Sequence, residues 1–183
     1  MTHAGLHADT TRQLTNWQPP DHAQRALREA FLGFLAARED ATARSCRPGH
    51  LTASAVVLDA TRTSVLLTLH PRVGRWLQLG GHCEDTDTTL AGAALREATE
   101  ESGIDGLRLD DEPLHLDVHP ITCSLGVATR HYDVRYRVVA PVGAVARISA
   151  ESDDLRFWPL DGLPTGVAAA DPSLLAALAA LRG

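Results

Sequence analysis

The sequence predicts a mixed α/β fold, of the α+β kind, in which a mixed β-sheet is sandwiched between helices. Two observations carry this prediction. Segments with helical and strand periodicity follow one another in the order helix, strands, helix, strands, helix. Hydrophobic residues make up 44% of the 183 residues, which is enough for one compact domain with its own core. Because helices and sheets each bury one apolar face, helices packed on a sheet satisfy this order best.

The first 48 residues are expected to form an N-terminal extension with one helix. Residues 1–20 are expected to be irregular, since they end in Pro19-Pro20. Asp21 can cap a helix that runs to about Arg38, because apolar residues recur there at spacings of three and four. A loop over residues 39–48 follows. The helix carries no chemistry, so packing or a homodimer contact is its default role.

Residues 49–183 are expected to form the main domain. Short runs rich in β-branched residues predict strands, and a polar turn between the first two predicts a hairpin. The expected strands are residues 53–58, 64–69, 76–79, 114–121, 131–139 and 155–160. The expected helices are residues 89–102, with Gly103 as a C-terminal stop, and 173–181.

The composition argues against two classes of partner. The formal net charge is -6, from 23 acidic and 17 basic residues, whereas a protein that binds a nucleic-acid polymer normally carries a basic patch. No apolar run approaches the ~20 residues of a membrane-spanning helix.

Three cysteines, an odd and sparse set, favour a reducing cytoplasm. All 17 basic residues are Arg, so a side-chain cation that meets a phosphate must be Arg or protonated His.

Three carboxylates share one face of the helix predicted over residues 89–102. Glu97, Glu100 and Glu101 are related by spacings of three and four residues. They repel one another, and the helix dipole also disfavours negative charge near the C-terminal end. A hard divalent cation, Mg²⁺ or Mn²⁺, would offset both penalties. The alternative is a solvated acidic face, but Gly80-Gly81 favours the metal, because two glycines let the backbone approach it closely.

The segment from Gly80 to Ile104, GGHCEDTDTTLAGAALREATEESGI, resembles the signature of the Nudix family. Its second half matches that signature completely as Arg96-Glu97-Ala98-Thr99-Glu100-Glu101-Ser102-Gly103-Ile104. The resemblance implies a Nudix-like fold and a catalytic domain over roughly residues 50–183. It also implies a hydrolase that uses Mg²⁺, or Mn²⁺, and water. The implied reaction cleaves a phosphoanhydride (pyrophosphate) bond in a nucleoside diphosphate derivative or a similar small organic diphosphate.

The resemblance also implies roles by position. Glu100 and Glu101 are the chief metal ligands, and Glu101 is counted with Glu97 and Arg96 among the catalytic residues. Glu97 is a further metal ligand or the base that activates water. Arg96 would hold Glu97 by a charge-assisted pair. A main-chain carbonyl of the Gly pair, with Gly81 as the expected residue, completes the metal shell.

The first half of the signature departs from the family pattern. Counted from Gly81, the family's loop Glu falls on Asp87, and Arg96 follows one residue late, which indicates one insertion in the loop. Asp87 is a shorter carboxylate that could support Arg96 from a longer loop. Glu84 is another carboxylate that could do so, and the sequence leaves this choice open.

Two predicted strands carry stripes of polar residues. The residues of the two stripes are His115, Asp117 and His119, and His131, Asp133, Arg135 and Arg137. Each stripe alternates with apolar residues, so the stripes would meet on one face if the strands pair. That face is an ordinary solvent-exposed surface, a substrate pocket with Arg135 or Arg137 on phosphate, or a second metal site.

Three further residues adjoin the segments that carry chemistry. His82 directly follows the Gly pair and is either a contact to substrate or metal or a solvated loop residue. Cys83 is expected to be a small buried thiol rather than a reactive one. Glu151, ahead of the last strand, is either an additional base or part of a plain acidic loop.

The resemblance leaves two other functions open. An enzyme similar to the isopentenyl diphosphate isomerases would use a His after the Gly, as His82 stands here, and a catalytic Cys. The complete acidic set, and Cys83 following rather than preceding His82, argue against it. A catalytically inactive effector-binding domain would explain the altered loop but not the intact acidic cluster. The signature does not encode which diphosphate is the substrate.

Overall fold

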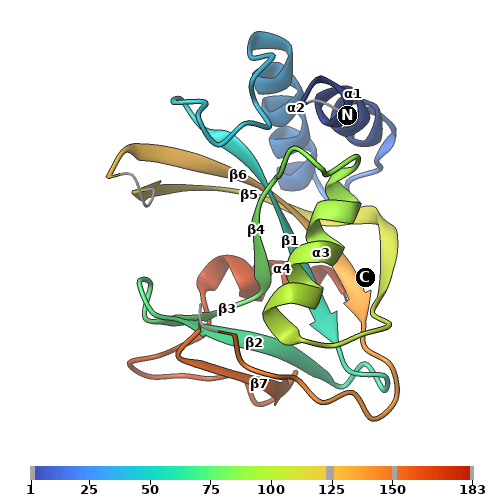
Figure 1. Cartoon of the computed structure of the whole chain (residues 1–183), viewed down its shortest axis with the longest axis vertical. Helices are drawn as coiled ribbons and strands as arrows, with labels where there is room; N and C mark the ends of the chain where they lie inside the picture. Colours follow the sequence, from blue (N-terminus) through green and yellow to red (C-terminus); the bar gives the residue numbers. More distant parts are fainter. Residues whose placement is uncertain (1–2, 123–125, 150–151, 182–183) are drawn as a thin grey trace.

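The computed structural model describes residues 3–122, 126–149 and 152–181. Four helices and seven strands follow one another within these ranges (Figure 1). The helices are α1 (His3–Asn16), α2 (His22–Ala37), α3 (Leu90–Ser102) and α4 (Pro172–Ala180). The strands are β1 (His50–Leu58), β2 (Ser64–His70), β3 (Arg75–Leu77), β4 (Leu79–His82), β5 (Arg108–Thr122), β6 (Ala128–Val139) and β7 (Asp154–Pro159). The predicted class, a mixed sheet with helices packed on it, is confirmed.

One mixed sheet of seven strands forms the centre of the molecule. Its path runs β3-β2-β1-β6-β5, while β4 pairs with β1 and β7 pairs with β2. The predicted hairpin is confirmed, because β1 and β2 are antiparallel with Val57 opposite Leu66. β1 and β6 are parallel neighbours with His50 opposite His131. This parallel pairing brings together two segments that lie far apart in the sequence.

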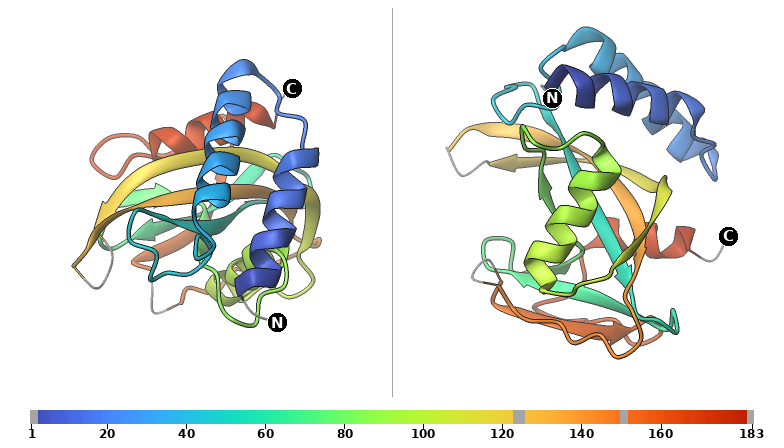
Figure 2. Two further views of the ribbon diagram at one scale, coloured as in Figure 1. Left: turned by 90° about the horizontal axis from the view of Figure 1, so that it is seen from above. Right: turned by 45° about the vertical axis from the view of Figure 1, so that its right-hand side comes forward.

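Helices cover both faces of the sheet (Figures 1 and 2). Side chains alternate along β1, so Ala53 joins the apolar cluster of α1, α2 and α3 while Val56 joins that of α4. The small residues Ala93 and Ala94 are fully buried and let α3 lie close to the sheet. Leu174 anchors α4 on the opposite face. None of the helices in the described ranges is long and apolar enough to cross a lipid bilayer.

α3 begins and ends as the sequence predicts. The hydroxyl of Thr89 caps its start by accepting a hydrogen bond from the N–H of Gly92. Gly103 ends the helix in the left-handed conformation, with φ 61°. Glycine adopts this conformation without the steric penalty of a Cβ. The two ends fix the register of α3 and therefore the face on which its carboxylates lie.

The expectation that residues 1–20 are irregular is wrong, and the N-terminal extension holds two helices rather than one. α1 buries Leu6 and Leu14 almost completely. Its Thr10 and Thr11 donate their hydroxyls to carbonyls one turn earlier. The segment has too few apolar residues for a visible helical period. Packing against α2 and α3, rather than intrinsic propensity, therefore stabilises this helix.

Two strand predictions differ in detail from the structure. The segment predicted as one strand over residues 76–79 forms β3 and β4, which are separated at Gln78. β5 begins at Arg108 rather than at Leu114, and its pairing with β6 is irregular on both sides of Pro113. Because proline has no N–H to donate, it interrupts the ladder of an edge strand at this point.

Candidate active site

Arg96 lies at the centre of an acidic cluster. Its guanidinium donates two hydrogen bonds to the Asp87 carboxylate, at 3.1 Å from Nε and 2.9 Å from Nη2. Nη1 donates to Glu97 and to Glu100, each at 3.1 Å, and Nη2 donates to the carbonyl of His82 at 3.0 Å. The hydrogen bond to Asp87 is the main cause that raises the pKa of Arg96 above its ordinary value. One cation therefore gathers Glu97 and Glu100 of α3 and Asp87 of the preceding loop.

Asp87, rather than Glu84, is the loop carboxylate that holds Arg96. The side chain of Asp87 is only 6% exposed, and it also accepts a hydrogen bond from the N–H of Glu84 at 2.8 Å. The carboxylate of Glu84 is 60% exposed and lies 3.8 Å from the guanidinium. The longer loop therefore folds back far enough for the shorter side chain to reach Arg96.

The Gly80-Gly81 pair lets β4 pass close to two neighbours. A Cβ on Gly81 would lie 2.8 Å from the carboxylate of Glu97. A Cβ on Gly80 would lie 2.5 Å from the Cα of Ser54, and the φ of Gly80 is 146°. Gly80 therefore requires glycine, whereas a side chain at position 81 would displace the carboxylate of Glu97. The backbone of Gly81 lies directly against the Glu97 carboxylate, which is the proximity that a shared metal ligand set needs.

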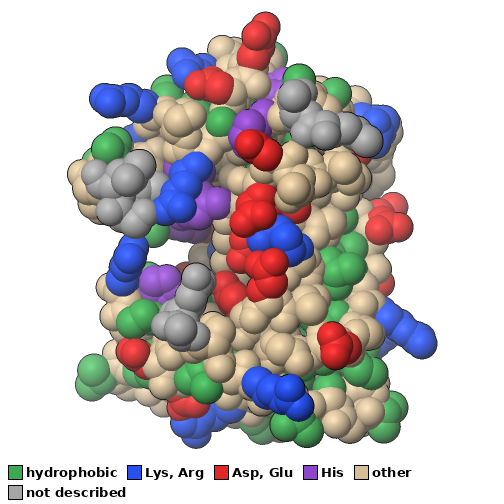
Figure 3. Space-filling view, in the orientation of Figure 1, with side chains coloured by type: hydrophobic (Ala, Val, Ile, Leu, Met, Phe, Trp, Pro, Cys, Tyr) green, Lys and Arg blue, Asp and Glu red, His purple; other side chains and the backbone are tan. Residues whose placement is uncertain are grey.

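The acidic cluster reaches the molecular surface. Glu97 and Glu101 are half-buried, and Glu100 is exposed. Figure 3 shows acidic side chains gathered around an arginine in the middle of this face, beside a hollow. Histidine and arginine side chains border the hollow on its other sides (Figure 3). A small molecule in the hollow would therefore lie between the acidic cluster and these basic groups.

The two polar stripes meet on one face because β5 and β6 pair in antiparallel fashion. The cross-strand partners are His115 with Arg135, Asp117 with Asp133, and His119 with His131. This face is not an ordinary solvent-exposed surface, since Asp133 is 2% and Arg135 1% exposed.

Asp133 and Arg135 belong to a buried polar network. Asp133 accepts hydrogen bonds from Thr52 at 3.0 Å, Ser54 at 2.7 Å and the guanidinium of Arg135 at 2.9 Å. Arg135 also donates to the carbonyl and the hydroxyl of Ser173, at 2.7 and 2.8 Å. The ion pair between Asp133 and Arg135 compensates for the burial of both charges. The hydrogen bonds from Arg135 to Ser173 attach the start of α4 to the sheet. The expectation of Arg135 on a substrate phosphate is not met in this conformation, because its guanidinium is buried against protein groups.

His115 and Arg137 also have protein partners. His115 is buried, and its Nε2 accepts a hydrogen bond from the side-chain amide of Gln24 in α2 at 3.0 Å. Burial is the main cause that lowers the pKa of His115. Arg137 forms an ion pair with Asp110 across β5 and β6. Both residues, predicted as substrate contacts, thus connect elements of the fold.

Three histidines from three strands form a second cluster, here called the histidine cluster. It consists of His50 in β1, His82 in β4 and His131 in β6, with ring centroids 5.0 to 5.1 Å apart. Burial is the main cause that lowers the pKa of His131 to about 3 and that of His82 to about 4. The ring of His119 lies 5.3 Å from that of His131, but a 2.7 Å hydrogen bond to Asp117 raises the pKa of His119.

His50 was not predicted from the sequence as a site residue. It stands directly after Pro48-Gly49 at the start of β1, in a segment without a recognisable motif. Its proximity to His131 depends on the parallel pairing of β1 with β6. No sequence signal available in one chain predicts that pairing.

Cys83 is a buried thiol, as expected. Burial is the main cause that raises its pKa to about 12, and its Sγ lies 3.8 Å from the carbonyl of Leu51. A thiol in this state is a poor nucleophile at neutral pH. Glu151, the expected additional base, and Cys123 lie outside the described residues.

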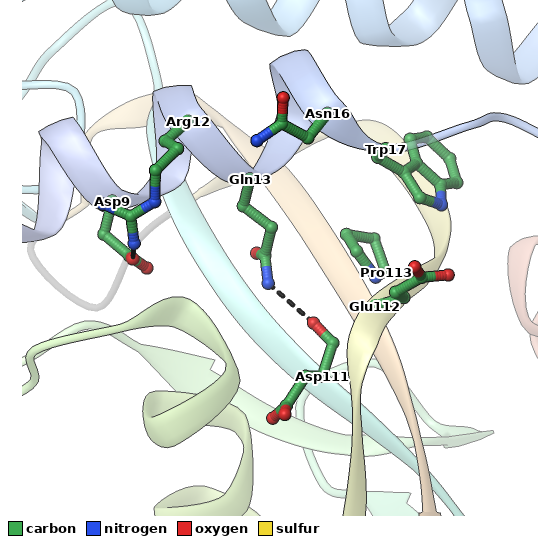
Figure 4. Close-up of a pocket in the computed structure, with 8 residues that line it drawn as sticks. All are labelled: Asp9, Arg12, Gln13, Asn16, Trp17, Asp111, Glu112 and Pro113. Carbon is green, nitrogen blue, oxygen red and sulfur yellow. Dashed lines mark hydrogen bonds and ion pairs between the residues drawn. The ribbon is translucent and has the colours of Figure 1, made fainter.

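A separate pocket lies between α1 and the start of β5 (Figure 4). Its volume is about 260 Å³. Arg12 pairs with Asp9 on its wall, and the amide of Gln13 donates to the carbonyl of Asp111 at 2.7 Å. None of the predicted site residues lines this pocket, and its polar groups attach α1 to β5.

Comparisons with known proteins agree with this fold. The profile of a family described as NUDIX domain matches residues 48–178. A NUDIX-family hydrolase from Clostridium perfringens is 24% identical, with a TM-score of 0.52 over 73% of this chain and 96% of that chain. A MutT NUDIX hydrolase from Burkholderia pseudomallei is 22% identical, with a TM-score of 0.54 over 73% and 98%. The MutT protein from Methanosarcina mazei Go1 is 14% identical, with a TM-score of 0.58 over 75% and 95%. No curated protein matches the chain.

Proposed function

The chain belongs to the Nudix family, and we propose that it is a metal-dependent hydrolase that cleaves a phosphoanhydride bond in a nucleoside diphosphate derivative or a similar small organic diphosphate. One observation carries this proposal. Glu97 and Glu100 of α3 gather around Arg96 at the surface, beside a hollow (Figure 3). Hydrolysis of a diphosphate requires charge neutralisation and an aligned water, and such a cluster suits both requirements.

The ligand types of the acidic cluster suit Mg²⁺ or Mn²⁺. Carboxylate and main-chain carbonyl oxygens are the ligands that these hard ions prefer. The absence of a Cβ at Gly81 leaves a space beside the carboxylate of Glu97 that any side chain would fill. We therefore assign Glu97, Glu100, Glu101 and the carbonyl of Gly81 as the groups that hold the ion.

The side chains of the cluster have separable roles in this proposal. A bound ion would neutralise the diphosphate charge and lower the pKa of a water in contact with it. Glu97 is a ligand or the base that takes a proton from that water. Arg96 is a positioning residue, because its 3.1 Å hydrogen bond orients the carboxylate of Glu97. Asp87 positions Arg96 in turn through two hydrogen bonds.

The remainder of the substrate would occupy the hollow beside the cluster. Of the residues in the polar stripes, His119 retains a side chain that is 38% exposed, while Arg137, at 39%, is paired with Asp110. Its hydrogen bond to Asp117 raises its pKa, so it carries positive charge more readily than His82 or His131. We assign His119 as the stripe residue that contacts an anionic or polar group of the substrate.

The alternative functions have less support. An isomerase would need a reactive thiol in this loop, but the pKa of Cys83 is raised to about 12 by burial. An inactive effector-binding domain would not need carboxylates that share one face of α3 with an arginine between them. The altered signature loop is the main argument for an inactive domain. That argument is weakened because Asp87 of this loop still accepts two hydrogen bonds from Arg96.

Phosphate release from a panel of nucleoside diphosphate derivatives, with Mg²⁺ and with Mn²⁺, tests this function. We expect turnover of at least one compound, its loss in excess chelator and its recovery when metal is restored. Glu101→Gln should lower turnover at limiting metal, and excess metal should partly rescue it. Glu39→Gln, which changes an exposed glutamate outside the cluster, is the matched control. Turnover in excess chelator would contradict the metal-dependent hydrolase, and tight binding without turnover would favour the effector-binding domain.

A further inference from the structure

We propose that His50, His82 and His131 form a binding site for a first-row transition-metal ion of the Zn²⁺ type, separate from the acidic cluster. Each imidazole offers one nitrogen, and these nitrogens all lie within 4.8 Å of one another. Zn–N bonds of about 2.0–2.1 Å in tetrahedral geometry place the nitrogens about 3.4 Å apart, so side-chain rotations that draw the three rings together would complete the set.

The sheet holds these three side chains together. His50 and His131 are direct partners in the parallel pairing of β1 with β6. His82 pairs with Thr52, two residues beyond His50, so alternation puts both histidines on the same face of β1 and β4. Because each histidine comes from a strand with a fixed register, the cluster is formed before any ion binds.

Two nitrogens of the cluster have unsatisfied hydrogen-bonding capacity. The Nε2 atoms of His82 and His131 are buried and have no hydrogen-bond partner within residues 3–122, 126–149 and 152–181. A buried polar atom in this state is costly, and an ion is one of the few groups that can satisfy it. The Nδ1 of His50 lies 3.5 Å from the carbonyl of Cys46, the kind of contact that orients metal-bound histidines.

The donor set decides the class of ion. Three imidazoles with no carboxylate in the set suit Zn²⁺, Co²⁺, Ni²⁺ or Cu²⁺, whereas Mg²⁺ requires oxygen ligands. Metal binding requires neutral imidazole, the form in which each ring can present a lone pair to the ion. Three protein ligands leave a tetrahedral ion one open position for water or for a substrate atom.

Titration of tag-free protein with Co²⁺, in millimolar Mg²⁺ that occupies the acidic cluster, tests the site. We expect one Co²⁺ per chain, with the strong visible absorption of a four- or five-coordinate nitrogen-ligated ion. Equimolar Zn²⁺ should abolish that absorption, and further Mg²⁺ should not. Weak absorption typical of six oxygen ligands, or no binding at micromolar Co²⁺, would overturn the proposal.

Single variants locate the bound ion. His131→Asn and His82→Asn should each weaken Co²⁺ binding by about 100-fold or more, since removal of a direct ligand should exceed the 10–100-fold cost of losing a partner that only orients one. His22→Asn changes an exposed histidine of α2 and should leave binding unchanged. Glu101→Gln should also leave Co²⁺ binding unchanged. A failure of the proposed metal site in the acidic cluster can therefore be distinguished from a failure of the proposed site in the histidine cluster. Binding that survives both histidine variants, or that is lost in Glu101→Gln, would overturn the site. The wild-type spectrum decides the question if a variant does not fold.

Discussion

The acidic cluster and the histidine cluster lie on opposite sides of one short strand but are held together by different means. Gly81 and His82 are adjacent in β4, so Gly81 meets Glu97 of α3 while His82 meets His50 and His131 on the other side. The acidic groups repel one another and depend on Arg96. The histidines depend on the register of three strands.

This difference determines which substitutions each cluster can tolerate. A cluster of like charges held by one cation is sensitive to any change in that cation or its supports. A cluster of buried rings held by strand register is sensitive first to its own side chains and to the sheet. Substitutions that change Arg96, its supports or its partners should therefore have graded effects on the acidic cluster.

Glu97→Gln should have the largest effect on catalysis. The change keeps the volume of the side chain but removes its charge and basicity. Loss of a general base should lower turnover by about 10²–10⁴-fold, with little rescue by excess metal. Turnover measured against metal concentration checks this result, and Glu39→Gln is the matched control. Full rescue by metal would show that Glu97 is a ligand and not the base.

Gly81→Ala should disturb the acidic cluster through sterics alone. The added Cβ would lie 2.8 Å from the carboxylate of Glu97, which must move. Misplacement of a catalytic group by about 1 Å can lower turnover by about 10²-fold. Gly33→Ala is the matched control, because nothing lies within 4 Å of its Cβ and alanine should stabilise α2 by about 1 kcal/mol. Steady-state kinetics and thermal unfolding of both variants separate the two effects. Wild-type turnover in Gly81→Ala would contradict the proposed geometry.

Asp87→Ala should have a smaller effect that acts through Arg96. The guanidinium loses two hydrogen bonds but keeps those to Glu97 and Glu100. Loss of such a supporting partner typically lowers activity or metal affinity by about 10–100-fold. Glu84→Ala, at an exposed side chain 3.8 Å from Arg96, should change turnover little. The reverse order of severity would mean that Glu84 supports the arginine during catalysis.

The acidic cluster was more predictable from the sequence than the histidine cluster for a physical reason. Spacings of three and four residues fix a helix face, so the carboxylates of α3 could be assigned together before any fold was known. The choice between Asp87 and Glu84 depends on how a loop folds back, and no periodicity encodes that path. The position of His50 depends on a parallel pairing between distant strands.

The remaining differences have similar causes. Strand alternation correctly predicted that the polar stripes share a face, but not that α4 covers Arg135 there. α1 was not predicted from the sequence, because packing stabilises this helix and its residues show no clear helical spacing of apolar side chains. The resemblance to the Nudix family is confirmed, whereas the roles of individual residues stay predictions that the variants above test.

The smallest expected effect concerns His115. Its place in the polar stripe predicted a substrate contact, but in the structure its ring binds Gln24 and holds α2 on the sheet. His115→Leu should remove the hydrogen bond with Gln24 and lower the free energy of unfolding by about 1 kcal/mol at neutral pH. Turnover should not change, because the residue acts in the fold and not in either cluster. His22→Leu, at an exposed position of α2, is the control and should change neither quantity.

The pH dependence of this difference distinguishes His115 from a residue of the site. Burial lowers its pKa in the folded protein below the ordinary 6.5, so the unfolded chain binds the proton more tightly. Between the lowered pKa and about 6.5, acidification therefore destabilises the wild-type protein, while above 6.5 the contribution is constant. The variant lacks this group, so the difference in stability should narrow as the pH falls from about 8 to 5. Denaturant unfolding across that range measures it. A constant difference would mean that the pKa of His115 is not shifted by folding. A difference that widens would mean that the folded state binds the proton more tightly, and Gln24 could not donate to the protonated ring.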